Sequence, residues 1–550
     1  TDMTTGSIMR HLIAFSVPLL IGNVFQQLYN TVDSVVVGNF VGKQALAAVG
    51  SVAPIINMLI GFFTGFATGA GVLISRYFGA HERENVHKAV QTTIALTIIL
   101  SVALSVVGVW MTPLMLRAMQ TPDDVIVQAE EYLRIYFAGL SGLLLYNSGS
   151  GILRAVGDTK RPLYFLVVSA VVNTVLDIVF VAVFRMGIAG VAIATVIAQL
   201  ASAVLTLMVL TRTAGEYHVT LRELRVDKEM LGKICALGLP AALQLAVTSF
   251  SNVFVQSYIN RFGSDCMAGW TSYNKIDAFA LLPITSISMA TTTFVGQNLG
   301  AGDPVRARQG TRTALWLSAA ATAIILVPLM IFAPQLIRLF NQEPDVCAYG
   351  TLFIRLSSPF YLLITVNQVI SGALRGAGDS RNCMYITLGS FVVFRQVYLM
   401  IVYKLWGTII PVVMGYPAGW VVCSVIFFFY YRSGRWKKSA VFGDDRQVCF
   451  CCEIPHGGFH AHDVLGSIGL AGDDVHRADV DIRDRRREED VYSLGESRFD
   501  LSGFDLLWPV LHGLRRSVCC PDCGDDQGQI NKVSFHFTAV LKSIIADGWL

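Results

Sequence analysis

Long apolar runs constrain this chain more than any other feature of its sequence. A helix needs roughly 20 consecutive, mostly apolar residues to cross the hydrocarbon core of a membrane. Runs of that length centre near residues 24, 60, 102, 140, 173 and 199, and again near 246, 282, 322, 361, 393 and 420. Because continuous helices satisfy their own backbone polar groups in lipid, these runs predict an all-α integral membrane protein with twelve transmembrane helices.

The charged residues divide the chain into two unlike parts. They make up 15% of the 550 residues, whereas an average soluble domain contains roughly 25%. Residues 1–439 hold 31 Lys and Arg and 20 Asp and Glu, a net charge of +11. Residues 440–550 hold 11 basic and 19 acidic residues, a net charge of −8. We therefore assign the membrane protein to the first part and treat the second as a tail.

Lys and Arg in the loops predict the orientation, because cytoplasmic loops carry the excess of both residues. If the N-terminus is cytoplasmic, few basic residues fall in the outward loops: Lys43, Arg117, Arg185, Arg261, Arg338 and Lys404. We therefore expect a multi-pass protein of the plasma (cytoplasmic) membrane, the inner membrane where the cell has two, with both termini cytoplasmic. The first apolar run is long and lacks a small-residue cleavage site, so we expect no cleavable signal peptide.

An internal repeat divides the membrane part into halves. Residues 151–160, GILRAVGDTK, reappear as residues 372–381, GALRGAGDSR, and the same offset of 221 pairs Gly79 with Gly300. Each half has six spans, an even number, so the repeat predicts two six-helix lobes related by a pseudo-twofold axis along the membrane normal. The expected domains are an N-lobe with spans 1–6 (1–212), a cytoplasmic linker (213–233), a C-lobe with spans 7–12 (234–439) and a cytoplasmic tail (440–550).

Polar residues inside the spans of the first half form one candidate site, since ionisable residues in a membrane are costly. Asp33 lies in span 1 and Asp177 in span 5. Asn173 precedes Asp177 by four residues and shares its helix face, and Thr195 in span 6 adds a hydroxyl. These groups form an all-oxygen set suited to Na+. They suit a proton equally, because one carboxylate favours the protonated form of another nearby.

The repeat supplies an internal control for this site. At the 221-residue offset, the position of Asp177 is taken by Tyr398, and the second half lacks the polar set. It has instead Lys275 and Asp277 in span 8, which could neutralise one another, and Arg395 in span 11. A purely structural polar cluster would more readily recur in both halves, so the asymmetry favours a functional role for the first-half residues.

Small residues and prolines predict local backbone features. Gly61, Gly65 and Gly69 repeat at every fourth position of span 2, a spacing typical of close helix packing. Pro18 in span 1 and Pro240 in span 7 each remove a backbone donor and predict a kink. Because Pro18 precedes the first-span carboxylate, it is also a hinge candidate.

Residues 8 to about 436 resemble the multidrug and toxic compound extrusion (MATE) family of transporters. The resemblance is carried by Pro18 with the QQLYNTVD segment at 26–33, by Gly50 with Pro54, by RAVGD at 154–158 with its repeat at Arg375, and by the pair Asn173 and Asp177. It implies two six-helix lobes, alternating access, and export of organic, often cationic, compounds in exchange for Na+ or H+.

The resemblance also implies roles for individual residues. The implied cation-coupling site is made by Asp33, Asn173, Asp177 and Thr195. The implied substrate contacts on the cavity wall of the same lobe are Gln26, Tyr29 and Asn147. Some members of the family carry acidic residues in spans 7 and 10, but here those spans offer only Gln244, Gln256, Asn367 and Gln368. This departure argues against a second cation site in the C-lobe.

Three other functions compete with that of an exporter. A flippase for lipid-linked sugars would use the same scaffold but would need a strongly basic cavity. A membrane enzyme finds no support, because the chain has no phosphate-binding loop and no HExxH motif. A channel would not require carboxylates in one half alone. We expect no enzyme activity, no cofactor apart from the coupling ion, no metal beyond that ion, and a monomer that meets small organic substrates and membrane lipids but no nucleic acid.

The tail has a composition of its own. Six of the eleven cysteines lie there, three of them near His456, His460 and His462 and three at 519–523, and the familiar zinc-finger spacing of paired CxxC motifs is not met. Its mixed acidic and basic runs show no sustained helical or strand period. We expect residues 440–550 to be a disordered, non-native extension, such as an out-of-frame continuation, with a cytoplasmic metal-binding tail as the alternative.

Overall fold

The computed structural model describes residues 2–118, 123–213, 215–220, 222, 224–434 and 436, and every regular element in these ranges is helical. The first half contains α1 (Ile8–Val36), η1 (Val37–Val41), α2 (Lys43–Gly79), α3 (Arg83–Ala118), α4 (Asp123–Ala138), α5 (Leu140–Ala155), α6 (Lys160–Asp177), η2 (Ile178–Val183) and α7 (Gly187–Arg212). The predictions made for the tail, residues 440–550, lie outside the described residues.

The second half repeats this series of helices. It contains α8 (Lys228–Ile259), η4 (Asn260–Phe262), α9 (Ser264–Ala280), α10 (Leu282–Gly300), α11 (Pro304–Ile331), α12 (Ala333–Arg338), α13 (Pro344–Ser357), η5 (Ser358–Phe360), α14 (Tyr361–Gly376), α15 (Ser380–Leu388), η6 (Gly389–Phe394), α16 (Arg395–Trp406), α17 (Ile409–Val413) and α18 (Gly415–Arg432). The elements η1, η2 and η6 are π-helical, whereas η4 and η5 are 3₁₀ turns.

Within the described residues, ten helices are long and apolar enough to cross a membrane, and there are eleven if the bent pair α9 and α10 is counted as one span. The remaining predicted span, centred near residue 140, corresponds to α4 and α5. These two helices of 16 residues each are separated at Gly139, and neither is long enough to count as a span alone. The all-helical membrane fold is confirmed, while the count of twelve is matched only when α4 and α5 are taken together.

The internal repeat is visible in the boundaries of the helices. Helix α5 covers residues 140–155 and α14 covers 361–376, an offset of 221 at both ends. The same offset relates the starts of α3 and α11, the starts of α4 and α13, and the ends of α2 and α10. The two halves therefore fold alike, as the sequence repeat predicts.

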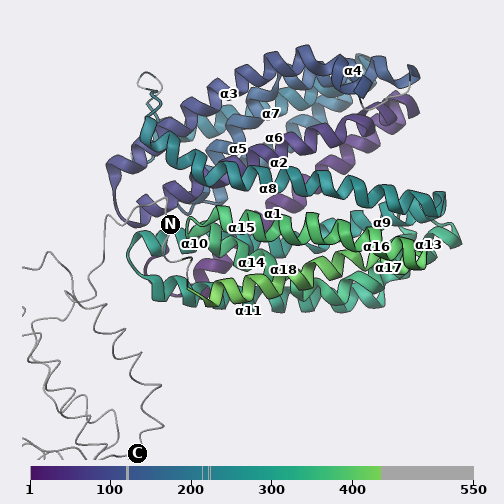
Figure 1. Cartoon of the computed structure of the whole chain (residues 1–550). Helices are drawn as coiled ribbons and strands as arrows, with labels where there is room; N and C mark the ends of the chain where they lie inside the picture. Colours follow the sequence, from purple (N-terminus) through teal and green to yellow (C-terminus); the bar gives the residue numbers. More distant parts are fainter. Residues whose placement is uncertain are drawn as a thin grey trace, which may run out of the picture. The chain divides into compact units, whose positions relative to one another are not determined.

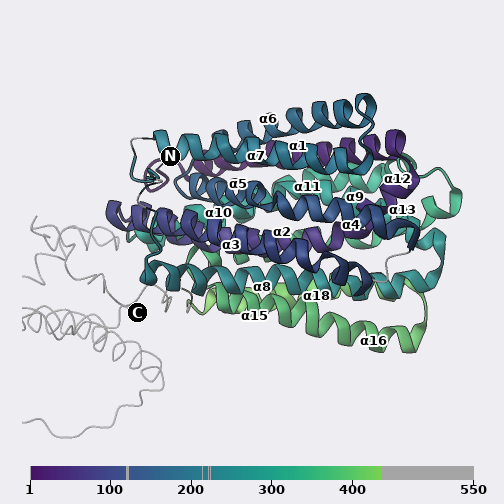
Figure 2. The same cartoon turned by 90° about the horizontal axis from the view of Figure 1, so that it is seen from above.

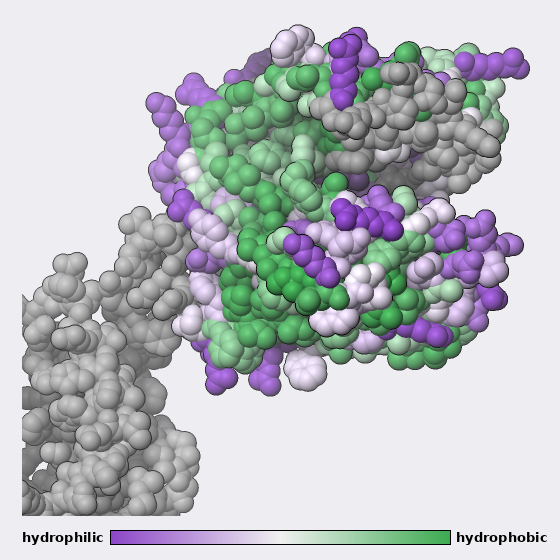
Figure 3. Space-filling view, turned by 45° about the vertical axis from the view of Figure 1, so that its right-hand side comes forward, coloured by the Kyte–Doolittle hydropathy of each residue, from purple (hydrophilic) through white to green (hydrophobic). Residues whose placement is uncertain are grey.

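The helices run side by side along a common direction (Figures 1 and 2). In Figure 1, α3 to α7 lie on one side of the bundle and α9 to α18 on the other, with α2 and α8 packed against each other along the boundary. Helix α1 packs against both α6 and α10 and so touches both halves. Apolar side chains cover much of the flank of the bundle, as expected for a surface that meets lipid (Figure 3).

The glycines of span 2 allow α2 and α8 to approach closely. A Cβ at Gly65 would lie 2.5 Å from the Ala242 backbone, and one at Gly69 would lie 2.3 Å from the Gly238 backbone. Real Cβ atoms essentially never come this close, so both positions require glycine. A Cβ at Gly61 would make an ordinary contact of 3.7 Å. The predicted packing role therefore holds for two of the three glycines.

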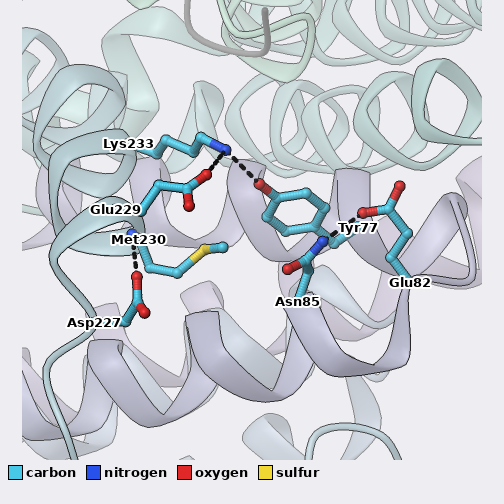
Figure 4. A network of polar contacts seen from close by, with 7 residues as sticks. All are labelled: Tyr77, Glu82, Asn85, Asp227, Glu229, Met230 and Lys233. Atoms are coloured by element: carbon cyan, nitrogen blue, oxygen red, sulfur yellow. Dashed lines mark hydrogen bonds and ion pairs between the residues drawn. The ribbon is translucent and has the colours of Figure 1, made fainter. Parts of the chain in front are cut away.

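The start of α8 is tied to the first half by polar contacts (Figure 4). Lys233 Nζ donates to the Tyr77 hydroxyl of α2 at 3.1 Å and to Glu229 at 2.6 Å. The Asp227 carboxylate caps α8 by accepting from the Met230 backbone N–H at 2.9 Å, the usual role of an N-cap aspartate. Helix α8 thus begins at Lys228, inside the segment that the sequence predicts as a linker.

Both span prolines lie inside continuous helices. Pro18 is within α1 and Pro240 within α8, and each helix continues on both sides of its proline. Each proline removes one backbone hydrogen bond from its helix. A hinge at Pro18 stays a prediction.

Candidate functional site

Three of the four predicted cation-coupling residues meet in the core of the first half. Asn173 and Asp177 lie on α6 and are 1% and 0% exposed, and Thr195 on α7 is 6% exposed. Asn173 Nδ2 donates to Thr195 Oγ1 at 3.5 Å, and that hydroxyl donates in turn to the Val191 carbonyl at 3.0 Å. The four-residue spacing of Asn173 and Asp177 places both on the face of α6 that packs on α7.

The fourth residue, Asp33, reaches the same place from α1. Its carboxyl group lies close enough to the Asp177 carboxyl group for the two to interact electrostatically. Two carboxylates repel each other at this distance unless a proton or another cation lies with them. The four residues predicted from the sequence are therefore brought together by α1, α6 and α7.

The oxygen atoms of this cluster lack donors. Asp33 Oδ1, Asn173 Oδ1 and both carboxylate oxygens of Asp177 are buried and accept no hydrogen bond from the described residues. A buried acceptor without a partner costs about 1–3 kcal/mol, and more if it is charged. Oxygen atoms in this state are the ligands that a hard cation such as Na+ takes, and a proton would relieve them equally. The donor set thus fits either coupling ion.

A π-helix borders the cluster. Asp177 is the last residue of α6, and the π-helical η2 follows it at once. The π-helical η1 begins four residues after Asp33. Short π-helical segments inside α-helices are frequently found at functional sites. Their position beside both carboxylates agrees with a functional cluster.

Two tyrosines of the site were not predicted. Tyr132 and Tyr136 on α4 are each 4% exposed, and their rings stack with centroids 6.3 Å apart. Tyr132 lies within electrostatic range of Asp33 and Asp177, as does Tyr29 of α1. Tyrosines at helical spacing are common core residues, so only the packing of α4 against α2 and α7 reveals these two as walls of the site.

The predicted substrate residues lie in different places. Tyr29 adjoins the carboxyl pair, Gln26 is exposed, and Asn147 on α5 donates to the Leu143 carbonyl one turn earlier at 3.0 Å. None of them lines the large cavity described next. Their substrate role stays a prediction, and the structure groups only Tyr29 with the coupling residues.

A cavity of about 520 Å³ lies between the two halves. Its walls come from α2 and α5 of the first half and from several helices of the second half, including α8, α9, α10, α14 and α18. Pockets of roughly 300–1,000 Å³ accept drug-sized molecules. The cavity is therefore the candidate substrate site, and it is built largely by the half that lacks the carboxyl pair.

Lys275 and Asp277, which could neutralise one another, do not form an ion pair. The Asp277 carboxylate accepts hydrogen bonds from the hydroxyls of Tyr361 and Tyr273, the latter at 3.5 Å. Lys275 Nζ lies instead over the Phe340 ring, 5.4 Å from its centroid. Residues two apart on a helix point in different directions, which explains why the pair does not meet.

Together, the duplicated helical bundle, its buried carboxyl pair and the cavity between its halves define a polytopic membrane transporter. The family model MatE matches the chain twice, at residues 18–179 and 240–401. The chain belongs to this family of transporters.

Individual relatives agree with this assignment. The chain is 32% identical to a probable multidrug resistance protein of Bacillus subtilis (strain 168), YpnP, over 80% of this chain and 98% of that protein. It is also 32% identical to a second one from the same strain, YoeA, over 79% and 96%. A solved structure described as the outward-facing conformation of a multidrug resistance MATE family transporter matches with a TM-score of 0.74, 25% identity, and coverage of 80% and 98%.

Proposed function

We propose that this protein is a secondary active multidrug exporter, which moves organic compounds out of the cell in exchange for Na+ or H+ by alternating access. The observation that supports the coupling is the cluster of Asp33, Asn173, Asp177 and Thr195. In this cluster Asp33 Oδ1, Asn173 Oδ1 and both Asp177 carboxylate oxygens are buried without a donor among the described residues. The relatives named as multidrug resistance proteins support the substrate class. The chain has no phosphate-binding loop, which favours an ion gradient over ATP as the energy source.

The cluster would couple an ion to transport through a difference in affinity. A cation drives a conformational cycle only if it binds one conformation more tightly than the other. Uptake of Na+ or H+ by the Asp33 and Asp177 carboxyls would remove their repulsion and let α1 and α6 pack differently. That change would weaken substrate binding in the outward-facing conformation. The compound would therefore be released before the protein returns to the inward-facing conformation.

The remaining parts of the proposal concern the setting of the protein. We place it in the plasma membrane as a monomer, with both termini cytoplasmic, because the basic residues concentrate in the loops of that side. Its partners would be small organic substrates and membrane lipids. Both ions remain candidates, because the donor set accepts either.

Drug efflux from cells tests this function. Cells that express Asp33→Asn or Asp177→Asn should lose most of the efflux of a fluorescent compound, because the neutral amide cannot carry the coupling charge. Asp265→Asn is the matched control, since Asp265 is exposed near the start of α9 and, among the described residues, only its neighbour Ser264 donates a side-chain hydrogen bond to it. Undiminished efflux by both site variants at normal expression would refute the assignment.

A further inference from the structure

The charge of the central cavity is opposite to that of the carboxyl cluster. Among the described residues, four charged ones line the cavity, namely Arg154, Asp277, Arg375 and Arg395. Three guanidinium groups against one carboxylate give the lining a net charge of +2. Since arginine stays protonated in proteins, this charge does not disappear with pH. The cavity thus differs from what the sequence, with its two first-half carboxylates, leads one to expect.

Arg395 is the most deeply buried of these cations, at 3% exposed. Its Nη2 donates to Ser251 Oγ at 3.0 Å and to Asn252 Oδ1 at 2.8 Å, both neutral acceptors on α8. Its Nε is buried and has no acceptor among the described residues. No carboxylate of the described residues forms an ion pair with it. A buried charge without a counter-ion is costly, so an anion entering the cavity would be favoured.

The position of Arg395 mirrors that of the carboxyl cluster. Arg395 directly follows the π-helical η6 and Asp177 directly precedes the π-helical η2, so each adjoins a π-helix, although the two π-helices lie at different positions of the repeat. At the 221-residue offset it lies three residues, about one turn, before Tyr398, which matches Asp177. The repeat therefore places an acid in one half and a base in the other, within one turn of the same structural position.

Arg154 and Arg375 place positive charge at the other end of the cavity. They are related by the repeat, and each is the penultimate residue of its helix, α5 or α14. Arg375 Nε is also buried without an acceptor among the described residues. Arg395 lies 15 residues into the span that starts at Ser380, which is roughly 20 Å deeper at 1.5 Å per helical residue. Positive charge therefore extends from the predicted cytoplasmic end toward the middle of the membrane.

Aromatic rings line the inner part of the cavity beside Arg395. The guanidinium of Arg395 lies 4.7 Å from the centroid of the Tyr416 ring. Trp270 and Trp420 flank that ring, with centroid distances of 5.6 Å and 6.1 Å. Such a wall accepts planar rings by stacking. Asp277 faces the same cavity, but two tyrosine hydroxyls already donate to its carboxylate.

We propose that the cavity selects aromatic organic anions, whose ring stacks on Trp270, Tyr416 and Trp420 and whose carboxylate, sulfonate or phosphate pairs with Arg395. The proposal rests on the proposed export function and names its substrate class. It assigns opposite charges to the two lobes, because the first binds the coupling cation and the second binds the anionic cargo.

Equilibrium dialysis of the purified full-length protein, without any ion gradient, tests this selectivity. The probes are 1-pyrenesulfonate, 1-pyrenemethanol and 1-pyrenemethylammonium, which share one ring system and differ in charge. The native protein should bind the sulfonate at least tenfold more tightly than the ammonium. Arg395→Gln should weaken sulfonate binding at least tenfold and leave the neutral alcohol within about twofold, whereas Arg395→Lys should retain most of the sulfonate affinity.

The controls separate a charge effect from misfolding and from a different cargo. Arg261→Gln removes a cation that stacks on Tyr258 and Tyr403 outside the cavity lining. This variant should leave the affinities for all three probes unchanged. Farnesyl pyrophosphate tests a lipid anion, the cargo of a flippase, and should bind more weakly than the sulfonate. The proposal fails if the ammonium binds as tightly as the sulfonate, if Arg395→Gln weakens all three probes equally, or if farnesyl pyrophosphate binds more tightly.

This experiment is independent of ion coupling. Asp33→Asn should leave sulfonate binding intact even though it abolishes gradient-driven export. Retained sulfonate selectivity without ion-driven export would refute the proposed function alone. Ion-driven export by a protein that binds only the ammonium would refute the anion proposal alone.

Discussion

Replacing Gly79 or Gly300 with alanine should open the contact that closes the two halves at the predicted cytoplasmic end. Gly79 ends α2 and Gly300 ends α10. A Cβ at Gly79 would lie 1.9 Å from the Gln297 carbonyl oxygen, and one at Gly300 would lie 1.9 Å from the Arg76 carbonyl oxygen. Gly79 and Gly300 are related by the 221-residue offset, and so are Arg76 and Gln297. The two contacts are therefore the same contact, repeated by the internal symmetry of the chain.

The size of the effect follows from these distances. Ordinary contacts of a Cβ begin at 3.4 Å, so the backbones must separate by about 1.5 Å. Overpacking of this kind costs about 1–3 kcal/mol. In the proposed alternating-access cycle this contact parts in the inward-facing conformation, so the cost falls on the closed conformation alone. The equilibrium should therefore shift about 5- to 150-fold toward the conformation in which the helix ends are apart.

Pulsed electron paramagnetic resonance measures this shift directly. Spin labels at Glu84→Cys and Val305→Cys, both exposed near the starts of α3 and α11, report the separation in a chain whose native cysteines are replaced by alanine. Either glycine variant should gain a population at longer distance. Gly232→Ala is the control, because its Cβ would meet nothing within 4 Å. An unchanged distance distribution in folded Gly79→Ala protein would refute the reasoning.

Three further predictions use the same structure. Gly65→Ala and Gly69→Ala should lower the melting temperature of the detergent-purified protein, because each Cβ would overlap the α8 backbone, whereas Gly61→Ala should be neutral or slightly stabilising; equal effects at all three would contradict the α2–α8 contact. Asn173→Leu should raise the cation concentration needed for half-maximal export at least several-fold, since it removes a buried oxygen of the coupling cluster, and an unchanged concentration dependence would exclude the amide from the site. Deletion of residues 440–550 should leave transport in vesicles unaltered, and a loss of transport on deletion would show that the tail is functional.

Features set by local pattern were predictable from the sequence. The apolar runs and the repeat gave the helical membrane fold and its duplication, and the helix boundaries follow the 221-residue offset. Asp33 and Asp177 could be grouped because isolated carboxylates in a membrane demand partners. The break of one span at Gly139 was not foreseen, because an apolar run does not show whether its helix is continuous.

Features that depend on tertiary packing escaped prediction. The tyrosines that donate to Asp277 come from two helices, α9 and α14, so no spacing along the chain predicts that Tyr361 meets Asp277. The basic lining of the cavity gathers arginines from α5, α14 and α16, and no sequence spacing brings these three together. Charge counts along the chain therefore missed the opposite polarity of the two sites.

Transport into proteoliposomes tests the central claim most directly. Purified protein in vesicles that carry only a Na+ gradient or only a pH gradient should accumulate a fluorescent substrate under one of the two. Asp33→Asn and Asp177→Asn should abolish this accumulation while retaining substrate binding. Accumulation that needs neither gradient, or that persists in both variants, would contradict ion-coupled export through the carboxyl cluster.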